Sequence, residues 1–166
     1  TCAGPSKLVY TSPLVTDKTI VTMSGYGGPS LAIRRGGTGD VTRSHRLWFK
    51  PERQDNPQRV GSGVIVGDHL YILNEPGIAW CMEVATGKRL WQQRLGTAKC
   101  WSSMCYVDGR LYVVNMDGTT FVLKPDPTAC QVIAENKLEE LTRGSLAFSQ
   151  GKVMVRSYNH LYCIGK

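Results

Sequence analysis

VDGRLYVVN (Val107 to Asn115) has the pattern of a tight β-hairpin, and related runs return along the chain. Asp108-Gly109 at its turn supplies the positive φ that a two-residue hairpin loop requires. The related runs are VTDKTIVTM (Val15 to Met23), VGDHLYILN (Val66 to Asn74) and SQGKVMVRS (Ser149 to Ser157). One strand position recurs in steps of 51, 41 and 42 residues, at Thr19, Leu70, Leu111 and Val153. A period of about 40 residues with several short strands per unit is typical of β-propeller blades.

Each hairpin is followed by further strands. A third strand is predicted at AWCMEV (Ala79 to Val84), TFVLK (Thr120 to Lys124) and LYCIG (Leu161 to Gly165). A fourth, outer strand is predicted at HRLWFK (His45 to Lys50), KRLWQQ (Lys88 to Gln93) and CQVIAE (Cys130 to Glu135). The last repeat stops after its third strand. The sequence therefore predicts an all-β fold of about four four-stranded antiparallel blades, forming a partial ring or half of a seven- or eight-bladed ring.

We interpret residues 1–166 as a single partial propeller domain with approximate repeats at 8–50, 60–95, 101–140 and 144–166. A closed ring of seven or eight such blades needs on the order of 300 residues. Three arrangements would complete it: a longer protein, two chains sharing one ring, or a small four-bladed ring. KLVY (Lys7 to Tyr10) could then supply the missing outer strand. We expect the isolated chain to self-associate, as a twofold pair.

Composition and charge limit the function. No apolar run approaches the roughly 20 residues of a membrane-spanning helix. The net charge is +7, and basic residues gather between positions 34 and 59. These basic residues are Arg34, Arg35, Arg43, Arg46, Lys50, Arg53 and Arg59. No aromatic series accompanies them, as a single-strand nucleic-acid site would require. We therefore interpret this region as solvated loops of mixed charge and predict no nucleic-acid partner.

The residue types that carry catalysis are scattered. The six cysteines form no CxxC pair, the three histidines are far apart, and no G-x-S-x-G occurs. Cys100 and Cys105 could form a disulfide or remain free thiols. We predict no catalytic, cofactor-binding or metal-ligating residues. Whether the chain is an enzyme stays open, and the scattered residues favour a protein without catalytic activity.

CMEVATGKRLW (Cys81 to Trp91) resembles the tryptophan-docking repeat of the pyrroloquinoline-quinone-like propellers, the quinoprotein alcohol dehydrogenase-like family. Cys81 stands at the small-residue position of that repeat, and Thr86, Gly87 and Trp91 match it outright. The first repeat keeps the pattern in part, with Trp48 at the tryptophan position. We therefore predict that the structural docking and turn residues are Trp48, Cys81, Thr86, Gly87, Trp91, Asp108 and Gly109.

The resemblance implies a bacterial, extracytoplasmic protein of the periplasm or cell envelope, with this chain as a C-terminal portion of it. Enzymes of the family use two adjacent cysteines and a calcium site beside the quinone. No two cysteines are adjacent here, so we predict no pyrroloquinoline quinone or calcium. The first hypothesis is a non-catalytic scaffold that binds protein partners. The alternatives are a quinone-dependent oxidoreductase-type domain, or a carbohydrate-binding module in which Tyr26, Trp80 or Trp101 on an upper rim stacks on sugar rings.

Overall fold

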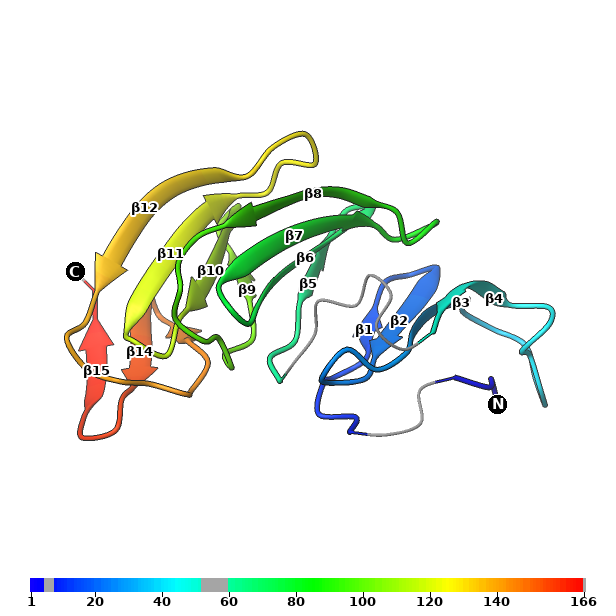
Figure 1. Cartoon of the computed structure of the whole chain (residues 1–166), viewed down its shortest axis with the longest axis horizontal. Coiled ribbons are helices and arrows are strands. Elements are labelled where there is room, and N and C mark those ends of the chain that lie inside the picture. The colour runs from blue at the N-terminus through cyan, green and yellow to red at the C-terminus, as the bar shows by residue number, and fades with distance from the viewer. Residues whose placement is uncertain (5–7, 52–59, 166) are drawn as a thin grey trace.

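The computed structural model describes residues 1–4, 8–51 and 60–165. Within these ranges the chain forms fifteen β-strands and no helix. The strands make four separate antiparallel sheets, each built from consecutive strands. Figure 1 shows the sheets following one another along an arc, with the two chain ends at opposite ends of it. The all-β propeller fold predicted from the repeats is confirmed.

We name the sheets blades A to D in chain order. Blade A contains β1 (Leu14–Val15), β2 (Thr19–Met23), β3 (Ser30–Arg34) and β4 (Arg46–Lys50). Blade B contains β5 (Val64–Val66), β6 (His69–Asn74), β7 (Ile78–Glu83) and β8 (Arg89–Arg94). Blade C contains β9 (Cys105–Val107), β10 (Arg110–Val114), β11 (Thr119–Lys124) and β12 (Gln131–Lys137). Blade D contains β13 (Ala147–Ser149), β14 (Lys152–Arg156) and β15 (Leu161–Ile164), and among the described residues it has no outer strand.

The strand pairing corrects the sequence alignment of the first repeat by one residue. Leu70 pairs with Ile65, and its partner in blade A is Ile20, which pairs with Val15. Thr19 instead closes the hairpin turn, because its carbonyl accepts the N–H of Thr16 at 2.8 Å. The predicted equivalence of Thr19 with Leu70 is therefore wrong. The alignment missed it because both runs carry Asp before the second strand, at different places in the turn.

The core lies between neighbouring blades, and the two inner blades, B and C, bury both of their faces. Blades A and B enclose one apolar cluster that includes Val21, Met23 and Met82. Blades B and C enclose the largest cluster, and blades C and D a smaller one around Val114 and Val155. Alternate residues of one strand thus face opposite neighbours, as the two-residue period of a strand requires.

The arc is open, so the small four-bladed ring is not formed (Figure 1). Leu8–Tyr10 of the predicted donor strand lie on the connection into blade A, where the carbonyl of Leu8 accepts the N–H of Gly25 at 2.9 Å. The matching connections into blades C and D make the same bond, from Met116 to Lys99 and from Tyr158 to Leu141. This segment therefore does not pair with β15 of its own chain, and Lys7 lies outside the described residues.

All six cysteines lie in the described residues, and all are free thiols. Burial raises the pKa of the Cys81 and Cys100 thiols to about 11 each. Thiols in this state stay protonated and unreactive at neutral pH. No helix of the described residues is long and apolar enough to cross a membrane.

Candidate interaction surface

Trp48, Thr86 and Gly87 meet at the junction of blades A and B. The indole Nε1 of Trp48 donates a hydrogen bond to the carbonyl of Val84 at 2.8 Å. A Cβ added to Gly87 would lie 2.8 Å from Cδ2 of Trp48, so the ring rests directly on this glycine. Thr86 shapes the same turn, because its hydroxyl accepts the N–H of Lys88 at 3.1 Å. Trp48 of blade A thus packs on the turn that joins β7 and β8 of blade B.

Cys81 and Trp91 form the equivalent contact between blades B and C. Trp91 pairs with Cys81 across β7 and β8, and its Nε1 donates to the carbonyl of Asp126 at 2.9 Å. Asp126 belongs to the turn of blade C that corresponds to the Thr86-Gly87 turn of blade B. Its carboxylate accepts the N–H and the hydroxyl of Thr128, which lowers the pKa of Asp126. The turn therefore keeps the accepting carbonyl although the glycine is lost.

Asp108 and Gly109 lie apart from both junctions, in the turn between β9 and β10. Both have positive φ, 47° and 75°, as the hairpin pattern predicts. A Cβ added to Gly109 would meet nothing within 4 Å, so the glycine serves the turn alone.

The loops between second and third strands share one end of the arc with the connections that enter each blade. Four side chains gather there, and we call them the rim surface: Glu75, Trp101, Arg143 and Tyr158. The Nε1 of Trp101 donates to Oε1 of Glu75 at 2.7 Å. The guanidinium carbon of Arg143 lies 4.8 Å from the ring centre of Trp101 and 5.5 Å from that of Tyr158. The rim surface therefore spans blades B, C and D as one continuous set of contacts.

Glu140 lies three residues before Arg143, and its carboxylate contacts blade D instead of the rim surface. Oε1 of Glu140 lies 2.5 Å from Nδ1 of His160, and Oε2 accepts a hydrogen bond from the hydroxyl of Ser157. The Ser157 hydroxyl and His160 hold the pKa of Glu140 below its usual value. These contacts fix the loop that carries Arg143 to the loop that carries Tyr158.

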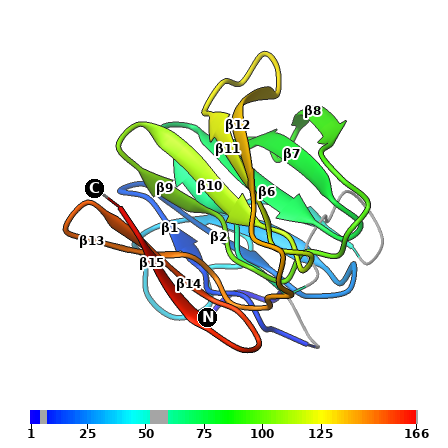
Figure 2. The same cartoon turned by 90° about the vertical axis from the view of Figure 1, so that its left-hand side faces the viewer.

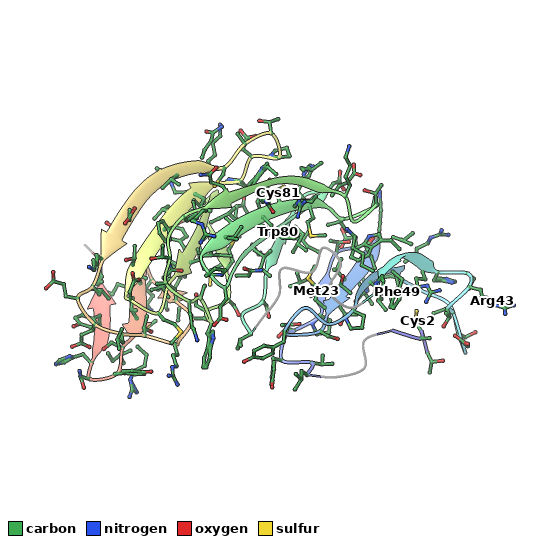
Figure 3. All side chains as sticks on the ribbon, in the orientation of Figure 1. Cys2, Met23, Arg43, Phe49, Trp80 and Cys81 are labelled. Atoms are coloured by element: carbon green, nitrogen blue, oxygen red, sulfur yellow. The ribbon has the colours of Figure 1, made fainter. Side chains whose placement is uncertain are left out.

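The aromatic residues proposed for sugar stacking do not share one surface. Trp101 lies on the rim surface, and Tyr26 lies at the same end of blade A with its ring centre 6.1 Å from that of Tyr10. Trp80, expected on the rim, lies instead within β7 beside Cys81 (Figure 3). The guanidinium of Arg89 covers the Trp80 ring at 4.6 Å. Trp80 is therefore a packing residue of the junction between blades A and B.

The described residues contain no group of three or more His, Cys, Asp or Glu side chains that could hold a metal ion. Trp48 and Trp91 lie on outer strands, and each indole donates a hydrogen bond to a carbonyl of the neighbouring blade. The ring of Trp101 is held by Glu75 and covered by Arg143.

The sequence profile of the outer membrane protein assembly factor BamB family matches residues 43–127, just over half of the chain. The chain belongs to this family. The BamB-family match covers the Trp48 and Trp91 junctions together with all of blade B. The pyrroloquinoline-quinone-like repeat identified from CMEVATGKRLW is thereby confirmed. No curated protein matches the chain.

Solved structures share the fold at low sequence identity. BamB from Moraxella catarrhalis is 14% identical with a TM-score of 0.68, over 92% of this chain and 41% of that one. A europium-containing methanol dehydrogenase is 15% identical with a TM-score of 0.55, over 81% of this chain and 25% of that one. The computationally designed Ika4 protein is 12% identical with a TM-score of 0.72, over 99% of this chain and 96% of that one. The chain thus spans less than half of the BamB structure.

Sequence reasoning missed the rim surface except for Trp101. The signal was present, because Arg143 follows Trp101 by 42 residues, which is the step of the repeat. Glu75 and Tyr158 likewise occupy matching places just after a second strand. Applying the repeat period to the loops as well as the strands would have brought these residues together.

Proposed function

We propose that this chain is part of a non-catalytic propeller that acts outside the cytoplasm as a protein-interaction scaffold. Membership of a family named for outer membrane protein assembly supports both the location and the scaffold role. The scaffold role is also supported by the three apolar clusters, because their buried side chains pack neighbouring blades together. We assign partner binding to the rim surface.

The observation that carries this assignment is the position of Arg143 between two aromatic rings. Arginine, tryptophan and tyrosine are the residues that contribute most to protein interfaces. Here the guanidinium is held by Trp101 and Tyr158, and Trp101 is held by Glu75. A side chain fixed before binding loses less conformational entropy when a partner docks. Tyr158 is 48% exposed, so this set can meet a partner without rearrangement.

Site-specific photo-cross-linking tests the assignment. A photoreactive phenylalanine analogue replaces Tyr158 in cells that produce the protein, and the matched control carries it at Tyr106, a similarly exposed tyrosine of β9. We expect one discrete cross-linked protein from position 158 and none from position 106. Arg143→Ala should abolish the product while leaving the melting temperature unchanged. Equal products from both positions, or a product that Arg143→Ala leaves intact, would contradict the proposal.

A further inference from the structure

Four serines link the blades by a repeated hydrogen bond. The N–H of Ser12 donates to Oγ of Ser62 at 3.1 Å, and the N–H of Ser62 donates to Oγ of Ser103 at 3.0 Å. The N–H of Ser103 then donates to Oγ of Ser145 at 2.8 Å. Each serine lies just before the first strand of its blade. We call these four residues the serine ladder.

The serine ladder has two complementary ends. Ser145 accepts from Ser103 but has no further ladder serine to receive its own N–H within the described residues. Ser12 donates to Ser62, while no ladder N–H reaches its hydroxyl there. Both terminal serines are exposed, whereas Ser62 and Ser103 are half-buried. A donor at one end of the arc thus matches an acceptor at the other.

The end faces of the arc match in the same sense. Blade D forms one end of the arc, and its strands β13, β14 and β15 lie toward the viewer in Figure 2. Its face that points away from blade C carries Ala147, Met154, Leu161 and Cys163. The equivalent residues of blade B are Val64, Tyr71, Ala79 and Cys81, which pack against blade C. Leu161 is 68% exposed, the most exposed large apolar side chain described. One position of this face differs in character from blade B, because Arg156 occupies the place of Leu73.

The opposite end of the arc presents the receiving face of blade A. Ile20, Leu31 and Ile33 correspond to Leu70, Trp80 and Met82, which pack against blade A from blade B. Gly4 crosses this face as a connection between blades does: an added Cβ would lie 2.1 Å from Cδ2 of Leu31. At the equivalent place in blade C, Gly96 lies against Phe121. Blade A is therefore shaped like an internal blade on its outer side.

We propose that a second copy of this chain closes the ring. Ser145 of each copy donates its N–H to the Ser12 hydroxyl of the other, and blade D of each packs on blade A of the other. Four sheets from each copy make an eight-bladed ring with two identical junctions. One copy cannot join its own ends, because they lie at opposite ends of the arc (Figure 1). This proposal concerns the end faces, so it stands or fails separately from partner binding at the rim surface.

Disulfide trapping with an internal reference tests the proposal. Ser12→Cys with Ser145→Cys is compared with Ser62→Cys with Ser103→Cys, in a chain carrying Cys2→Ser and Cys163→Ser to remove competing thiols. The internal pair occupies the ladder geometry within one chain and should oxidise without a change in mass. The terminal pair should give a covalent species of twice the chain mass on a non-reducing gel. Either terminal cysteine alone should give at least tenfold less of it.

Light scattering of the unaltered 166-residue chain supplies the second measurement. We expect a mass of two chains, and a dissociation constant raised at least tenfold by Leu161→Asp. The matched control is Leu141→Asp, an exposed leucine on the connection into blade D and away from the end face. A single-chain mass, a mass above two chains, or an internal disulfide between positions 12 and 145 would each overturn the proposal.

Discussion

The indole ring of Trp48 rests on Gly87 of the next blade, and only a glycine leaves room for it. Gly87 has a φ of 70°, and a Cβ at this position would lie 2.8 Å from the ring. The glycine therefore serves two needs at once, the left-handed turn and the close approach of the tryptophan. Gly109 has a similar φ of 75° but no atom within 4 Å of an added Cβ. A side chain at Gly109 would meet only the backbone strain of the turn, whereas a side chain at Gly87 would also clash with Trp48.

Gly87→Ala should lower the free energy of unfolding by about 2–4 kcal/mol, combining backbone strain with overpacking against Trp48. Gly109→Ala should cost only about 1–2 kcal/mol, because it meets strain alone. Urea unfolding of both variants checks the difference. In a Trp48→Ala background the two alanine substitutions should cost the same amount. An equal cost in the wild-type background would contradict the contact.

Trp91→Ala should destabilise the chain by roughly 2–3 kcal/mol, since the half-buried ring contacts the large cluster between blades B and C. Trp91→Phe keeps most of the apolar area but removes the donor to Asp126, and should cost about 1 kcal/mol. Denaturant unfolding of the two variants separates ring packing from the hydrogen bond. Equal losses would show that the indole N–H, not the ring, carries the junction.

Ser103→Ala should cost about 1 kcal/mol of unfolding free energy, because the half-buried N–H of Ser62 loses its acceptor. Ser149→Ala, on the exposed edge of β13, should change the stability by less than about 0.5 kcal/mol. Hydrogen exchange at the Ser62 amide supplies a local readout and should accelerate only in the Ser103 variant. Unchanged exchange would mean that the serine ladder does not hold this amide.

Glu140 should make the stability fall at acid pH. Its folded-state pKa is lowered from 4.5 by Ser157 and His160, so its contribution is present above pH 4.5 and is lost as the pH falls through the lower folded-state value. Melting temperatures measured from pH 6 to pH 3 should therefore drop more steeply for the wild type than for Glu140→Gln. Glu139→Gln, which removes the same charge one residue away, should keep the wild-type slope.

The repeat period allowed the propeller fold to be predicted because every blade repeats one hydrophobic and turn pattern. Trp80, Phe121 and Tyr162 were aligned correctly, and their pairing partners are equivalent in the structure. Thr19 was misaligned because Asp17 and Asp68 stand at different places in their turns, so that matching the two Asp residues shifts the first repeat by one residue. The rim surface could not be found from strand patterns, because its four residues lie in the loops and connections between the strands. The open ends of the serine ladder required the geometry of neighbouring blades.

The affinity of the rim surface for the protein that cross-links at position 158 tests the central claim most directly. Arg143→Ala should weaken binding at least tenfold, because it removes the side chain held between Trp101 and Tyr158. Arg110→Ala on β10, an exposed arginine away from the rim surface, should leave the affinity unchanged. Calorimetric titration of the three purified chains with that protein gives the comparison. If the wild type and Arg143→Ala bind with equal affinity, the scaffold does not bind its partner through the rim surface.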